Sequence, residues 1–209
     1  MDLRGGGGDN IRMRALAQEL VRLQPDIILA NSIPATVALQ RETRTIPIVF
    51  VALGDPVASG IVPRFNRPGG NITGFANYEA SLGGKWLELL SEIAPGLKRV
   101  AIMFNPDTAP VSAVSAYMPS LETAARSLKV VPITAPVHSD GEIETAIIAL
   151  GREPGGGLVV MSDISMVLHR AAIIAAAARN NVPAVYPNPT QARDGGAVTQ
   201  GRANPCARS

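Results

Sequence analysis

The stretch TIPIVFVALGDPVASGIVPRFNRPGGNITG, residues 45–74, joins a continuous apolar run to a segment rich in glycine, proline and asparagine. The run IPIVFVAL contains no polar residue between Ile46 and Leu53. A strand with one face in water would alternate polar and apolar residues, whereas a parallel strand that is covered on both faces is apolar throughout. The run is therefore expected to be a buried strand of a parallel sheet.

Similar apolar runs recur along the chain, and segments with helical periodicity separate them. The expected strands are 26–30, 46–53, 99–104, 129–134, 157–162 and 182–187, and the expected helices are 11–23, 34–43, 79–94, 110–127, 140–150 and 164–180. This alternation predicts an α/β fold of two Rossmann-like lobes, whose parallel sheets are covered by helices. We expect residues 1–76 and 189–209 to form an incomplete first lobe. Residues 77–188 are expected to form the second, with a four-stranded sheet.

The composition narrows the function classes. The chain has 209 residues, of which 46% are hydrophobic and 17% charged, as in folded proteins rather than disordered ones. Its net charge is only +2 and its arginines are scattered, so no nucleic-acid partner is expected. The apolar runs are far shorter than the roughly 20 residues that cross a bilayer, and the first ten residues lack the apolar core of an export signal. We expect no direct membrane insertion.

The glycines after Leu53 could either cradle a phosphate or build one wall of a cleft. A phosphate cradle requires glycines at fixed offsets, and no G-x-G-x-x-G pattern follows any expected strand. Around the Gly84-Lys85 pair a P-loop is also excluded, because Glu79 stands at the first glycine position and Trp86 at the Ser or Thr position. The segment is thus not expected to bind a nucleotide.

Other cofactor and catalytic patterns have little support. His138 and His169 are the only histidines, neither lies near a second ligand at metal spacing, and Cys206 is the single cysteine. There is no G-x-S-x-G nucleophile elbow. We expect no metal, no cofactor and no enzymatic activity, and we interpret His169 as a solvated residue within a helix.

Small polar side chains follow the expected strands at their carboxyl ends, where open parallel sheets bind ligands. The candidates for ligand binding are Asn31, Ser32, Asp55, Asn105, Asp163 and Tyr186. They lack a nucleophile and base pair and suit a small polar molecule. Ser32, Asn105 and Asp163 also precede helices, where N-capping alone would favour them, and Tyr186 could be a packing residue. Both interpretations stay open.

One further candidate lies beyond the glycine-rich segment. Gly69, Gly70 and Asn71 form an expected turn, after which Ile72 and Thr73 begin a short strand. Thr73 is included among the candidate ligand-binding residues.

Four segments carry a family resemblance, which extends over residues 9–196. They are ALAQELVRLQPDIILANSIPATVALQ, TIPIVFVALGDPVASGIVPRFNRPGGNITG, LGGKWLELLSEIAPGLKRVAIMFNPD, and VPAVYPN followed by DGG. With these segments the chain resembles ABC-transporter substrate-binding proteins of the tryptophan/tyrosine-binding type.

The resemblance implies a type I periplasmic-binding-protein fold and a small organic ligand, such as an amino acid, enclosed between the lobes. It further implies a membrane permease as partner, a periplasmic location, and a hinge at residues 66–76. Two alternatives remain: the effector lobe of a transcription regulator, and an enzyme on a doubly wound fold.

Overall fold

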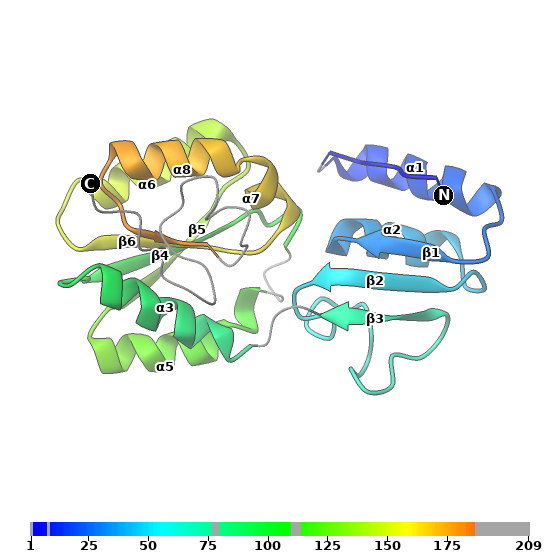
Figure 1. Ribbon diagram of the computed structural model, residues 1–209, viewed down its shortest axis with the longest axis horizontal. Helices are drawn as coiled ribbons and strands as arrows, with labels where there is room; N and C mark the ends of the chain where they lie inside the picture. Colours follow the sequence, from blue (N-terminus) through cyan, green and yellow to red (C-terminus); the bar gives the residue numbers. More distant parts are fainter. Residues whose placement is uncertain (1, 8, 77–79, 110–113, 187–209) are drawn as a thin grey trace. The chain divides into compact units, whose positions relative to one another are not determined.

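The computed structural model describes residues 2–7, 9–76, 80–109 and 114–186 (Figure 1). The chain divides into two compact units, Met1–Glu79 with Asp107–Ala116, and Ala80–Pro106 with Tyr117–Ser209. Both units contain parallel sheets and helices, which confirms the predicted α/β class. The assignment of residues 189–209 to the first lobe lies outside the described residues and stays a prediction. None of the helices in the described part is long and apolar enough to cross a bilayer.

The first unit holds a three-stranded parallel sheet in the order β1-β2-β3. Its elements are α1 (Asn10–Arg22), β1 (Ile28–Asn31), α2 (Ile33–Glu42), β2 (Ile48–Leu53) and β3 (Ile72–Ala76). Helix α1 begins after Asp9, whose Oδ1 accepts the N–H groups of Ile11 and Arg12 and so satisfies two donors at the helix start. The short strand predicted to begin at Ile72 is present.

Only one face of the first sheet is buried. Ile28, Ile48 and Ile72 lie side by side on that face and pack into a common core with α1 and α2. The opposite face carries Leu29 and Phe75, which are 65% and 71% exposed. The expectation that helices cover both faces is therefore wrong for this sheet within the described residues, because α1 and α2 pack against each other on one side.

Gly74 allows β3 to lie close to β2. A Cβ atom at this position would collide with the backbone oxygen of Phe50 and with its ring. Phe50 is 2% exposed and pairs with Gly74 in the parallel register. The glycine is thus required by a close approach of two strands, as glycines within strands often are.

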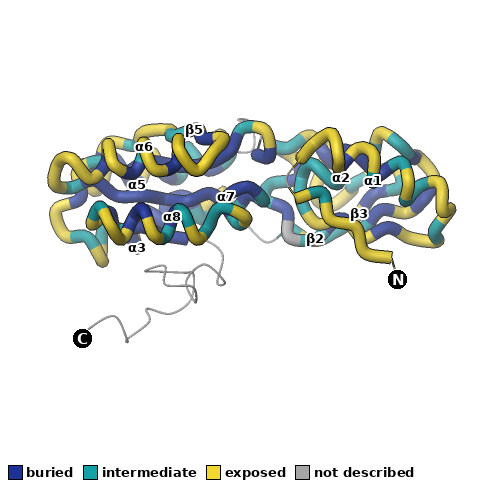
Figure 2. Tube along the Cα trace, turned by 90° about the horizontal axis from the view of Figure 1, so that it is seen from above, coloured by how far each residue is buried: buried dark blue, intermediate teal, exposed yellow. Residues whose placement is uncertain are grey.

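The second unit holds a four-stranded parallel sheet, as predicted, in the order β5-β4-β6-β7. Its elements are α3 (Leu82–Ile93), β4 (Arg99–Phe104), α5 (Met118–Leu128), β5 (Val131–Pro136), α6 (Asp140–Gly151), β6 (Gly156–Val160), α7 (Ile164–Leu168), α8 (Arg170–Arg179) and β7 (Ala184–Val185). Helices α3 and α5 pack together on one face, and α6 and α8 pack on the other (Figure 1). Strands β4, β6 and β7 are buried between them (Figure 2), whereas β5, at the edge of the sheet, exposes Val131 and Ile133.

Several expected elements of this unit differ in extent. The helix expected at 110–127 is represented by α5, which begins at Met118, while residues 110–113 lie outside the described part. It ends at Leu128, because the C-cap Lys129 has a left-handed φ of 58°, and β5 begins only at Val131. The helix expected at 164–180 is divided at His169, whose ψ of 9° departs from helical geometry. The last strand, expected at 182–187, is reduced to β7.

Candidate functional site

The strand order of the second unit creates a point at which neighbouring loops diverge. Strand β4 is followed by α5 on one face of the sheet, whereas its neighbour β6 is followed by α7 and α8 on the other. In open parallel sheets, ligands bind in the crevice outside the carboxyl ends of two such strands. Asn105 directly follows β4 and Asp163 follows β6, so the fold brings both predicted residues to this switch point.

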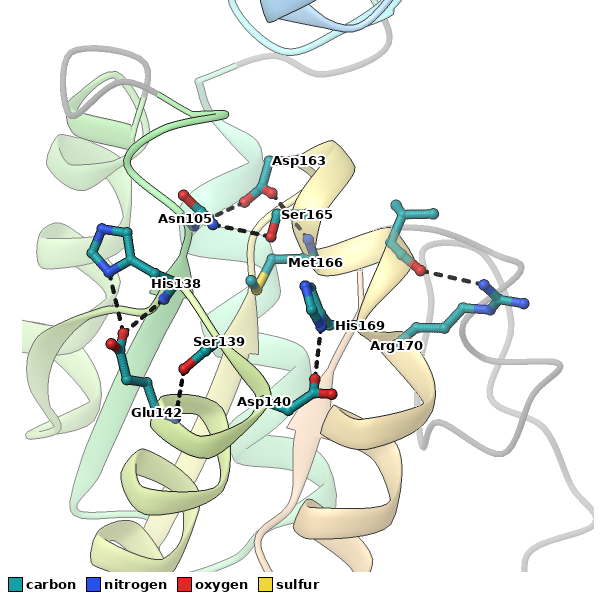
Figure 3. A network of polar contacts seen from close by, with 11 residues as sticks. Asn105, His138, Ser139, Asp140, Glu142, Asp163, Ser165, Met166, His169 and Arg170 are labelled. Atoms are coloured by element: carbon teal, nitrogen blue, oxygen red, sulfur yellow. Dashed lines mark hydrogen bonds and ion pairs between the residues drawn. The ribbon is translucent and has the colours of Figure 1, made fainter. Parts of the chain in front are cut away.

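A buried polar network connects the two loops (Figure 3). The backbone N–H of Asn105 donates to Asp163 Oδ2 at 3.3 Å, and Asn105 Nδ2 donates to Ser165 Oγ at 3.1 Å. Asp163 Oδ1 accepts the N–H of Met166 at 3.0 Å and thereby caps α7. Asn105, Asp163 and Ser165 are only 7%, 7% and 6% exposed. Burying polar groups without partners costs free energy, and these hydrogen bonds offset that cost.

Sequence reasoning missed Ser165. The signal was present, because Ser165 follows Asp163 by two residues at the start of an expected helix, where hydroxyl and carboxylate groups gather. Its hydroxyl accepts the amide of Asn105, a residue 60 positions earlier in the chain. The network contains hydrogen-bonding groups and a carboxylate, and so is suited to hold a polar solute.

Tyr186 comes directly after β7 in the same sheet. It is 1% exposed and belongs to the hydrophobic core between the sheet and helices α6 and α8. Burial raises the pKa of its hydroxyl, since the phenolate would be poorly solvated there. The packing interpretation accounts for this position, and a ligand contact stays a prediction.

In the first unit, Asn31 and Ser32 lie at the carboxyl end of β1. Asn31 is the last residue of the strand and is exposed. Ser32 caps α2, with Oγ accepting the N–H of Ala35 at 3.4 Å. Its backbone has φ 116° and ψ 151°, a region that residues other than glycine rarely adopt. Pro34 has no N–H and Ala35 is already bonded, so α2 presents few free donors to an anion.

Asp55 and Thr73 differ in position. Asp55 follows β2, and its Oδ1 accepts the N–H groups of Val57 and Ala58 at 2.9 and 3.0 Å, which caps the turn at the carboxyl edge. Thr73 instead pairs with Val49 in the first half of β2. Thus the sheet brings Asn31 and Asp55 to one edge but does not bring Thr73 to it.

Neither histidine is simply solvated. His169 Nδ1 lies 2.6 Å from Asp140 Oδ1, which corrects our interpretation of this residue (Figure 3). His138 donates its backbone N–H to Glu142 Oε2 at 2.7 Å, and its ring Nδ1 lies 3.1 Å from the same oxygen. The backbone bond, followed by the ring contact, lowers the pKa of Glu142. Among the described residues, no three His, Cys, Asp or Glu side chains group as a metal site.

A family profile and a related protein both match this chain. The family profile described as ABC transporter substrate binding protein matches residues 2–204. The tyrosine-binding protein of Clostridioides difficile (strain R20291) is 31% identical over 105 residues, which are 50% of this chain and 30% of that protein.

Two solved structures share the fold. An ABC domain from Streptococcus pneumonia in complex with L-Trp superposes with a TM-score of 0.81 at 18% identity, covering 92% of this chain and 63% of that one. A conserved domain protein from Vibrio cholerae gives the same score and coverages at 23% identity. This confirms the predicted type I periplasmic-binding-protein fold. The chain spans less than two thirds of the length of each of these three relatives.

Proposed function

This chain belongs to the family of ABC transporter substrate-binding proteins, and on that basis we propose that it binds a small organic solute for an ABC importer without altering it chemically. The observation that carries this proposal is the buried network of Asn105, Asp163 and Ser165 at the switch point of the second unit. The network offers carboxylate, amide and hydroxyl groups but no nucleophile and base pair. Such a set is suited to binding rather than to catalysis.

The proposed ligand class is an aromatic amino acid. One relative is a tyrosine-binding protein and a structural neighbour was solved with L-Trp. A zwitterion needs a negative partner for its ammonium group and donors for its carboxylate. Asp55 and Asp163 are the carboxylates that we assign to the ammonium group, because each lies at the carboxyl edge of its own sheet.

We further propose that capture involves closure of the two units on the solute, with the glycine-rich region 66–76 absorbing the change in backbone dihedral angles. Gly69 and Gly70 have φ of 72° and 61°, and added Cβ atoms at either would meet no atom within 4 Å. The turn at these two glycines is thus free of packing that would resist such a change. The remaining candidates, Asn31, Ser32, Thr73, Asn105 and Tyr186, are proposed to complete the ligand contacts. A membrane permease as partner and a periplasmic location belong to the same proposal.

The test is isothermal titration of the chain with a panel of amino acids, followed by two variants. Asn105→Ala is expected to weaken binding at least about tenfold, because a hydrogen bond to a charged ligand group is lost. Asn180→Ala is the matched control. It removes one local bond, Asn180 Nδ2 to Ala176 O at 2.8 Å, at the end of α8 and away from the switch point.

Three results are informative. Binding of an aromatic amino acid that Asn105→Ala weakens and Asn180→Ala does not would support the proposal. The absence of a binding heat with every amino acid of the panel would exclude this ligand class. Equal affinity of the wild type, Asn105→Ala and Asn180→Ala for the amino acid would show that the switch point is not the binding site.

A further inference from the structure

Helix α7 is tied at both of its ends to other parts of the second unit. At its start, Asp163 caps the helix and binds the backbone of Asn105. At its end, His169 donates its backbone N–H to Ser165 O at 2.9 Å, while its imidazole Nδ1 lies 2.6 Å from Asp140 Oδ1. Asp140 is the first residue of α6, so this contact ties α6 to the helix that carries the network (Figure 3).

We propose that Asp140 is a positioning residue for the solute site, because through His169 it holds α7 with Asp163 and Ser165 in reach of Asn105. The proposal rests on the function proposed above. Its physical basis is the length of α7, which has five residues and is therefore too short to persist on its own backbone hydrogen bonds. External contacts at its two ends must supply the order that the network requires.

The charged groups around His169 have defined partners. Arg170, next in the chain, donates to Val167 O at 3.3 Å, and Glu142 of α6 binds His138. Asp163 lies at the far end of α7, where it accepts from Met166. Asp140 is thus the carboxylate that faces the imidazole from α6.

A second ion pair made by α6 provides a matched control. Arg179 Nη2 lies 2.8 Å from Glu144 Oε1, one turn further along α6 and at the last residue of α8. It joins α6 to α8 without involving α7. Both pairs are partly exposed, with side-chain exposures of 33% and 67% for His169–Asp140, and 61% and 51% for Arg179–Glu144. A general loosening of α6 would affect both variants alike, whereas the proposed positioning of α7 involves Asp140 and not Glu144.

The first measurement needs no ligand. Hydrogen exchange of the Met166 and His169 amides, followed by NMR, is expected to accelerate about two- to fivefold in Asp140→Asn, the range expected for a partly exposed ion pair, and to stay unchanged in Glu144→Gln. Exchanging the charges, with Asp140→His and His169→Asp together, should restore protection. Equal rates in wild type and Asp140→Asn would overturn the proposal.

The second measurement is the Kd for the amino acid that the wild type binds. Asp140→Asn should raise it about two- to fivefold, whereas Glu144→Gln should leave it unchanged. If wild type binds no amino acid, the proposed function fails, yet the exchange rates still decide whether Asp140 holds α7. The exchanged pair, Asp140→His together with His169→Asp, should return the Kd to the wild-type value, and a Kd that stays raised would overturn positioning by this pair.

Discussion

The positive φ of Ser32 predicts that two substitutions at this position change the stability of the first unit in opposite directions. Its φ of 116° and ψ of 151° lie where a Cβ atom is unfavourable, at a cost of about 1–3 kcal/mol. Ser32→Gly removes that cost. It also removes the N-cap, which costs a few tenths of a kcal/mol when glycine is the replacement. The greater conformational freedom of glycine in the unfolded chain costs about another 0.5–1 kcal/mol. The expected net effect ranges from neutral to about 2 kcal/mol of stabilisation.

Ser32→Ala should have the opposite sign. Alanine keeps the Cβ atom and its strain while removing Oγ, which accepts from Ala35, so it should destabilise the first unit by about 0.5–2 kcal/mol. Glycine is already preferred to alanine at an N-cap, and the positive φ of Ser32 adds to that preference. The glycine variant is thus expected to be more stable than the alanine variant by about 0.5–4 kcal/mol.

Native-state hydrogen exchange of the α2 amides measures this difference within the first unit, where about fivefold in rate corresponds to about 1 kcal/mol. The only tryptophan, Trp86, is 1% exposed in α3, so its fluorescence reports unfolding of the second unit and should be the same in both variants. An alanine variant as stable as the glycine variant would refute the strain argument.

Three further predictions concern packing and charge. Gly74→Ala should destabilise by at least about 2 kcal/mol in chemical unfolding, because the new Cβ meets the Phe50 backbone; wild-type stability would contradict the close approach. Leu158→Ala should cost about 2–5 kcal/mol, measured by tryptophan fluorescence in urea, since Leu158 is 0% exposed; a loss below about 1 kcal/mol would mean that its core is loosely packed. Glu142→Gln should lower the Tm at neutral pH. The folded-state pKa of Glu142 is depressed, so its stabilisation is present above its ordinary pKa and disappears as the pH falls through the folded value; a Tm difference that persists in acid would contradict this.

Much of the fold follows from local pattern. Uninterrupted apolar runs such as residues 46–53 and 100–104 are typical of parallel strands, and helical periodicity between the runs predicts the crossover helices. Caps are equally local, since Asp9, Ser139 and Asp163 bind N–H groups within three residues of themselves. The candidate residues at strand ends could be named for this reason.

Their mutual geometry could not be obtained in this way. Asn105 meets Asp163 because β6 lies beside β4, although β5 separates them in the chain, and periodicity carries no information on strand order. Exposure also depends on neighbours, as Tyr186 at 1% and Phe75 at 71% illustrate for two aromatic residues of expected strands.

The sequence by itself therefore determined the parallel α/β class, the strand and helix segments, and the polar character of the strand ends, because each depends on residues within a few positions of one another. Only the tertiary structure decided which ends converge, where helix 164–180 divides, and that Ser32 takes a positive φ. These features arise from contacts between segments distant in the chain, and the free energy of such contacts appears only once the elements are packed.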